Sequence, residues 1–537
     1  MSKESDVYNV PRGTAYLTTQ QIITYTTYLI FYVALARVLD PIEVNEIGLL
    51  LAAQAAFVAL TQLGLPASAT RYISGSIARN DRETAGAAAR TILRLSISVG
   101  TAGFLLATIL SPFVGPSYIG TPDGGNLLII TFASGLLLDF ILLFGAFFVG
   151  VGSYARSLYQ NALYIPLSRG LGLLLALLGY RVLGIILGWI VGGLVALALS
   201  VYLWHGHLPS RSSHPLRPLL SFSLPVFGAA LIAFGQQYGD FSILNLILGH
   251  LASNGIYYVI VSSVSALSIL WIPVTQALYP ALSASHATDG SQAISDRLAI
   301  AFRLTNLAVL PFGAALAAVA PTVIGLVYKP TYVAQADIFA ILALATIFTA
   351  QGAILTTSLQ AVGRARQVLI VTLASTVIGL IAVASTARLL GTLGAAVGRI
   401  ILGVGIVILA RRSMESSAKT HVGNSLPTAI MLAVGVGIPL AIADYLLIVL
   451  NIPLIGHLSP LLRLPILILV FAAAFLSMSR AFGIFRASDF AILKDALPHR
   501  FHPQLRAIEH LIVGRKKEDG HGKSLAGPAG FEPATFG

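Results

Sequence analysis

The residues best suited to chemistry in this chain are the few charged and amide side chains that interrupt its long apolar stretches. The basic ones are Arg90, Arg94, Arg169, Arg303 and Arg399, and the acidic ones are Asp139, Asp240 and Asp444. Paired amides stand at Gln20-Gln21 and Gln236-Gln237. A guanidinium group carries paired donors that match the oxygens of a phosphate. The excess of arginine therefore predicts a site for an anionic group.

We expect Arg94, Arg169 and Arg399 to contact that anion. A charge placed deep in a membrane costs from about 2.5 kcal/mol upward, so it usually faces a cavity or a partner. Arg90 and Arg303 are further candidates for the same site, although their side chains could instead reach the membrane surface.

The acidic and amide residues have less defined roles. Asp240 could shape the polarity of the site, and Asp139 and Asp240 could couple it to a proton or cation. Both could also be structural partners of the arginines, and the residue types do not separate these readings. The amide pairs Gln20-Gln21 and Gln236-Gln237 are expected to line the same cavity, because they fall at equivalent positions of two related halves.

Composition indicates that lipid is the solvent of this chain. Of its 537 residues, 56% are hydrophobic and 10% are charged, and the mean hydropathy is +0.85. Soluble domains contain about 25% charged residues. There is no cysteine, which excludes disulfides and thiolate metal sites. The first eleven residues lack the features of a cleaved signal peptide, so we expect the first membrane segment to direct insertion.

About fourteen apolar segments are long enough to span a bilayer. They lie near 13–36, 44–65, 88–114, 126–149, 156–178, 182–204, 218–247, 254–278, 299–320, 335–361, 367–387, 393–410, 427–450 and 463–482. The sequence therefore predicts an all-α, polytopic integral membrane protein.

An internal repeat divides these segments. Val151-Gly152, an apolar run and then Gly184, Gly188 and Gly192 are matched about 210 residues later by Val362-Gly363, a similar run and then Gly394, Gly398 and Gly403. Both copies close a series of six segments, which is typical of two-lobed transporters. Glycines four residues apart also allow close helix packing. We expect a first six-helix lobe over 1–204, a cytoplasmic linker over 205–217, a second six-helix lobe over 218–412, and two extra membrane helices within 413–483.

Loop charges predict the orientation of the chain. With the N-terminus in the cytoplasm, most loop lysines and arginines fall on the inner side, as the positive-inside rule requires. The C-terminus is then also cytoplasmic, in a cytoplasmic membrane, and the two lobes are parallel repeats. Residues 484–525 form a basic tail that is either amphipathic on the membrane or solvated. Residues 526–537 are expected to be unstructured.

Motifs of several enzyme classes are absent. The sequence has no Walker A motif, no His-Glu-x-x-His and no Gly-x-Ser-x-Gly. We therefore expect no enzymatic activity, no cofactor, no metal and no nucleic-acid partner.

Several passages resemble the polysaccharide biosynthesis flippases. The stretch from Leu35 to Leu49 resembles their motif LARxLGPxxFG, although Asp40 replaces the glycine and Asn45-Glu46 replaces an aromatic stretch. Two further passages are similar to that family: Gly64-Leu-Pro-Ala-Ser-Ala-Thr-Arg-Tyr72, and Asp240 to Gly249 followed by Asn254-Gly-Ile-Tyr-Tyr258. The family belongs to the multidrug/oligosaccharidyl-lipid/polysaccharide exporter superfamily, which includes the O-antigen flippases.

This resemblance implies a function. Such a protein would move an oligosaccharide carried on a polyprenyl or dolichyl (pyro)phosphate across the membrane by rocking of the two lobes. Its partners would be that substrate, membrane lipids, and possible glycosyltransferases or a glycan polymerase. A cation-coupled multidrug antiporter of the same superfamily is the main alternative. A polytopic glycan polymerase is a further one, but it would be expected to carry a large outer loop with catalytic side chains.

Overall fold

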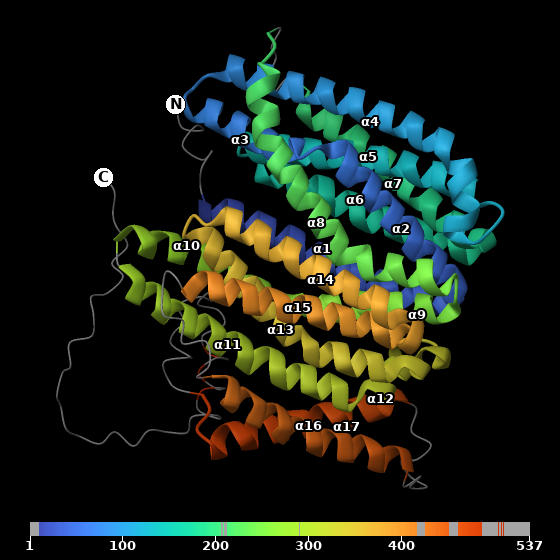
Figure 1. Cartoon of the computed structure of the whole chain (residues 1–537), viewed down its shortest axis with the longest axis vertical. Helices are drawn as coiled ribbons and strands as arrows, with labels where there is room; N and C mark the ends of the chain where they lie inside the picture. Colours follow the sequence, from blue (N-terminus) through green and yellow to red (C-terminus); the bar gives the residue numbers. More distant parts are fainter. Residues whose placement is uncertain are drawn as a thin grey trace.

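Apolar segments that cross lipid must satisfy their backbone hydrogen bonds internally, as helices or closed barrels. The computed structural model describes residues 10–205, 208, 212–288, 290–415, 425–449 and 460–485, together with residues 503, 506 and 509. Within these residues the chain is almost wholly helical and has no strand (Figure 1). The prediction of an all-α protein is confirmed. The expected tails, 484–525 and 526–537, lie almost entirely outside the described residues.

The elements follow one another along the chain as a series of helices. The first part comprises α1 (Val10–Val38), α2 (Pro41–Gln62), α3 (Leu65–Ala78), α4 (Arg82–Ile119), α5 (Gly124–Gly150), α6 (Tyr154–Leu175), the π-helical turn η1 (Ala176–Tyr180) and α7 (Arg181–Trp204). The second part comprises α8 (Leu216–Leu248), α9 (Ala252–Ser265), the 3₁₀ turn η2 (Ala266–Leu270), α10 (Ile272–Thr288), α11 (Gly290–Ala318), α12 (Ala320–Val327), the 3₁₀ turn η3 (Pro330–Gln335), α13 (Ala336–Ala361), α14 (Ala365–Leu390) and α15 (Thr392–Glu415). The last described helices are α16 (Leu426–Val449) and α17 (Pro460–Ala481).

Thirteen stretches of the described residues are long and apolar enough to cross a membrane. One of them, Tyr154–Trp204, spans two helices, because the backbone turns at Gly179 with φ 101° and α6 then packs along α7. This hairpin accounts for the fourteenth predicted segment. The segment predicted over 254–278 is not one continuous helix. It passes through the 3₁₀ turn η2 and restarts as α10, with Pro273 in the first turn of the new helix.

The internal repeat has a structural counterpart in two equivalent turns. Gly152 and Gly363 are both left-handed, with φ of 76° and 79°. The residue after each glycine donates its backbone N–H back into the preceding helix. Ser153 reaches the carbonyl of Phe148, Arg364 reaches that of Leu359, and both N–O distances are 2.8 Å. This is the pattern of a helix end closed by glycine.

The repeated glycines act as packing surfaces in both halves. A Cβ atom on Gly188 would lie 2.2 Å from the backbone nitrogen of Gly172, so α7 and α6 approach almost backbone to backbone. A Cβ atom on Gly398 would lie 2.3 Å from the side chain of Val383, which joins α15 to α14 in the same way. These contacts agree with the expected role of small residues between membrane helices.

The helices form two neighbouring groups that α8 and α9 connect. In Figure 1, α2 to α7 gather on one side and α11, α13, α14 and α15 on the other. Helix α8 packs on α2 and α3 of the first group and on α14 and α15 of the second. Helices α16 and α17 pack on each other, and α16 packs on α11 at the edge far from the first group. The lobe boundaries at 204 and 218 stay a prediction.

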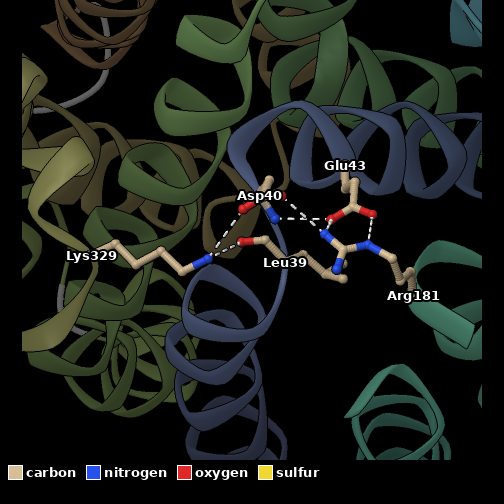
Figure 2. A network of polar contacts seen from close by, with 5 residues as sticks. All are labelled: Leu39, Asp40, Glu43, Arg181 and Lys329. Carbon is tan, nitrogen blue, oxygen red and sulfur yellow. Dashed lines mark hydrogen bonds and ion pairs between the residues drawn. The ribbon is translucent and has the colours of Figure 1, made fainter. Parts of the chain in front are cut away.

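One end of the bundle is fastened by a polar network, which we call the latch and define as Arg37, Asp40, Glu43, Arg181 and Lys329. Figure 2 shows Asp40, Glu43, Arg181 and Lys329 together with Leu39. Arg181 at the start of α7 pairs with Glu43, and with Asp40 at 3.0 Å. Lys329 comes from the second half of the chain, and its Nζ donates to the carbonyl of Leu39 at 3.0 Å. Arg37 donates to the carbonyls of Leu326 and Val327. The latch therefore joins α1, α2 and α7 to the turn that precedes η3.

Neutral contacts reinforce the same end. Asn45 of α2 donates to Asn245 of α8 at 2.8 Å, and Asn254 of α9 donates to the same oxygen at 3.1 Å. The closest approach is at Gly255, where a Cβ atom would lie 1.8 Å from the carbonyl oxygen of Pro41. Only glycine fits this position without a backbone shift. The two halves are thus packed tightly at the latched end.

Candidate functional site

A cavity of about 590 Å³ lies between the two halves of the chain, within the range typical of small-molecule sites. Its walls come from α1, α2, α5, α6, α8, α9, η2 and α15. A second cavity of about 480 Å³ adjoins it towards α13 and α14 and shares Tyr25, Gln237, Val261, Ser265 and Arg399 with it. The two spaces together form the candidate site.

Arg169 of α6 lines the first cavity and is 5% exposed. Its guanidinium carbon lies 5.4 Å from the ring centre of Tyr28, 5.3 Å from that of Phe31 and 4.9 Å from that of Trp189. Cations at such distances are attracted by aromatic faces. Its Nε and Nη1 atoms have no hydrogen-bond partner among the residues that the structure describes. Arg169 is therefore held by rings while two of its nitrogens remain able to donate to a ligand.

Arg399 of α15 lines both cavities but is already neutralised. Its Nε lies 2.7 Å from Oδ2 of Asp240, and its Nη2 lies 2.9 Å from Oδ1 of the same carboxylate. Tyr257 also donates its hydroxyl to Asp240 at 2.6 Å. Asp240 is 4% exposed, so its charge is compensated by a bidentate pair in a mostly buried place. Of the roles expected for Asp240, that of a structural partner of an arginine is the one that this geometry supports.

Tyrosines supply most of the remaining polar surface of the first cavity. Tyr25, Tyr28 and Tyr32 lie on one face of α1, at spacings of three and four residues. Across the cavity are Tyr238 of α8 and Tyr257 and Tyr258 of α9. The hydroxyls of Tyr32 and Tyr258 lie 3.2 Å apart, which ties α1 to α9. The sequence analysis did not predict this group, although spacings of three and four residues on α1 indicate that its three tyrosines share one helix face.

Asp139 of α5 is fully buried but does not line the cavity. Thr61 and Gln62 are its polar neighbours, but among the described residues neither carboxyl oxygen has a hydrogen-bond partner of good geometry. It lies beside Gln62, and both Gln62 and the preceding residue Leu138 line the cavity. A buried carboxylate without a partner is costly, so this site is better suited to the neutral acid than to the ion.

The remaining predicted residues fall in several places. Gln21, Gln236 and Gln237 line the cavities as expected, whereas Gln20 accepts a hydrogen bond from Ser157 between α1 and α6. Arg94 lies exposed on α4 and Arg90 half-buried on the same helix. Arg303 donates to the carbonyl of Ile484, beside α17, at 2.7 Å. The structure does not bring Arg90, Arg94 or Arg303 to the cavity walls.

The arrangement defines a class of protein: a polytopic helical membrane protein with a cavity lined by helices from both the first and the second part of the chain. Solved structures share this fold. The chain is similar to the "Lipid II flippase MurJ, inward closed conformation", with 12% identity, coverage of 87% of this chain and 98% of that chain, and a TM-score of 0.65. It is also similar to an inward-facing multidrug resistance MATE family transporter of the MOP superfamily, with 19% identity, coverage of 75% and 98%, and a TM-score of 0.60.

A third similar structure is a MOP superfamily transporter from Pyrococcus furiosus, with 17% identity, coverage of 76% and 96%, and a TM-score of 0.52. The sequence itself shows the family. The family model for polysaccharide biosynthesis proteins matches residues 10–286, which is more than half of the chain. The chain belongs to this family. A search of curated proteins gives no match.

Proposed function

We propose that this protein moves a lipid-linked oligosaccharide, carried on a polyprenyl or dolichyl phosphate, across the cytoplasmic membrane for surface polysaccharide or glycoconjugate synthesis. Its family and its fold support a transporter of the MOP superfamily. The observation that carries the choice of cargo is Arg169, a buried cavity cation with two nitrogens free to donate.

The proposed cargo fits the chemistry of the cavity. A phosphate oxygen can take the paired donors that Arg169 leaves free. Sugar rings and hydroxyls can lie against Tyr25, Tyr28 and Tyr238, whose rings and hydroxyls face the same space. The lipid tail stays among the membrane lipids while the headgroup crosses between the two halves.

We further propose that the latched end faces outward and that both chain termini are cytoplasmic. The positive-inside count supports this orientation. With this orientation, the conformation in the structure is closed on the outer side, where the latch joins the two halves. Transport would then require the latch to open, and alternating access would follow from rocking of the halves. Glycosyltransferases that build the sugar on its carrier would supply the cargo on the inner side.

The cavity offers little support to the alternative of a cation-coupled drug antiporter. That function expects an essential acidic group facing the substrate. Among the described residues that line the two cavities, none is acidic, and Asp240 is occupied by Arg399.

The test is lipid translocation by the full chain in proteoliposomes. The probe is an isoprenyl phosphate-linked sugar with a fluorescent label, and the readout is the rate at which the label becomes accessible to dithionite. We expect Arg169→Gln to lower this rate at least tenfold, from the loss of charge-assisted hydrogen bonds worth about 1.5–3 kcal/mol. Arg94→Gln is the matched control, because Arg94 lies outside the cavity. Equal rates for Arg169→Gln and wild type would overturn the proposal, as would exchange of an organic cation but not of the sugar lipid.

A further inference from the structure

The cavity walls carry a net charge that can be counted from the contacts. Among the described residues that line the two cavities, Arg169 and Arg399 are the charged ones. The charge of Arg399 is balanced by Asp240 through two short contacts, of 2.7 Å and 2.9 Å. Arg169 has aromatic neighbours, and within the described part of the chain two of its nitrogens have no hydrogen-bond partner. The site therefore presents one uncompensated positive charge.

This count limits the charge of the cargo. A buried charge needs a partner, because neither the protein interior nor lipid can solvate it as water does. One negative charge placed at Arg169 would be neutralised. A second negative charge in the same headgroup would have to compete with Asp240 for Arg399, and that would break a bidentate pair in a mostly buried place. The tyrosine hydroxyls can donate hydrogen bonds to a phosphate, but they supply no charge.

We propose that the cargo is joined to its lipid through a single phosphate, a phosphodiester with one negative charge, and not through a diphosphate. Arg169 pairs with that charge from α6. This inference rests on the proposed function and narrows it to one carrier chemistry. Trp189 packs against the same guanidinium at 4.9 Å, so it is placed to report on the occupied site.

The experiment compares two synthetic lipids on the full chain in nanodiscs. They are farnesyl phosphate-linked glucose and farnesyl diphosphate-linked glucose, which differ by one phosphate. The chain has three tryptophans, and the double substitution Trp204→Phe and Trp271→Phe leaves Trp189 as the reporter. We expect the monophosphate to bind at least tenfold more tightly than the diphosphate, and Arg169→Gln to abolish the fluorescence change with both.

Added positive charge should reverse the preference. Asp240→Asn releases the charge of Arg399, and Gln21→Lys adds a cation at the cavity wall while leaving the Asp240–Arg399 pair in place. We expect each variant to shift the ratio of affinities at least tenfold towards the diphosphate. Gln21→Lys keeps the test valid if Asp240→Asn does not fold.

The outcomes separate the two proposals. If wild type binds the diphosphate as tightly as the monophosphate or more tightly, the single-phosphate inference is wrong while the proposed function stands. An affinity ratio that Gln21→Lys leaves unchanged also overturns the charge argument. If neither lipid binds to wild type, the proposed function fails first.

Discussion

Each half of the cavity region contains one buried arginine and one buried aspartate, which form an ion pair in the second half but not in the first. In the first half, Arg169 and Asp139 lie on neighbouring helices, and neither has an ion-pair partner among the described residues. In the second half, Arg399 and Asp240 are joined by a bidentate ion pair. The comparison separates two uses of buried charge. A paired charge holds helices together, whereas an unpaired charge is available to a ligand or a proton.

This difference divides the tasks between the halves. The Asp240–Arg399 pair ties α8 to α15, and Tyr257 of α9 joins them through its hydroxyl. We propose that Arg169 takes the cargo anion and that Asp139 takes the coupling proton.

Breaking the pair in the second half should have the largest effect. Asp240→Ala leaves Arg399 without its counter-ion, and we expect the free energy of unfolding to fall by about 3–5 kcal/mol. The measurement is unfolding by SDS titration in mixed micelles. The double variant Asp240→Ala with Arg399→Met should recover most of the loss, because an apolar pair replaces an ionic one. If the double variant is no more stable than the single one, the charges do not act as a pair.

Removing Arg169, the arginine without an ion-pair partner, should leave the free energy of unfolding unchanged or raise it. Arg169→Met replaces a buried cation by an apolar side chain that can pack among Tyr28, Phe31 and Trp189. We expect the same unfolding experiment to show unchanged stability or a gain of up to about 2 kcal/mol, together with loss of cargo binding. A loss of stability as large as that of Asp240→Ala would show that Arg169 is also structural.

The buried acid of the first half should affect coupling more than stability. Asp139→Asn keeps the shape of the side chain, so we expect stability to change by less than about 1 kcal/mol. In proteoliposomes, a pH gradient should drive translocation by wild type, whereas the variant should not respond to the gradient. A variant that responds as wild type does would remove Asp139 from the coupling role.

The latch should give the smallest change in stability. Lys329 and Asp40 are partly exposed, and exposed ion pairs contribute about 0–1 kcal/mol. Lys329→Met should nevertheless raise the population with the latched end open. The chain has no cysteine, so labelling of Ser262→Cys in the cavity by an impermeant maleimide measures this opening. We expect faster labelling from the latched side, and an unchanged rate would show that the latch does not control access.

The sequence predicted the fold more completely than the site. Apolar length and the repeat at Gly152 and Gly363 gave the helical class and the equivalent turns, because both depend on local rules. The site depends on which face of each helix meets its neighbours. Arg94 and Arg169 look equivalent as arginines in apolar segments, yet only Arg169 faces the cavity.

The latch illustrates the same limit. The sequence shows that Asp40 stands where the family motif has a glycine. This replacement does not predict that Asp40 pairs with Arg181 and Lys329, because these residues lie far from it along the chain. Long-range contacts of this kind are set by helix packing, which a single sequence does not disclose.

The tight contact between Gly255 and Pro41 makes the closure of the latched end depend on the size of one side chain. If this end opens during transport, α9 must separate from the start of α2, and on closing the two backbones must return to a contact that leaves no room for a Cβ atom. A methyl group added by Gly255→Ala would force α9 away from the start of α2. On the orientation proposed above, it would keep the outer end partly open without changing any charge, so the size of one side chain would set the direction in which the cavity opens.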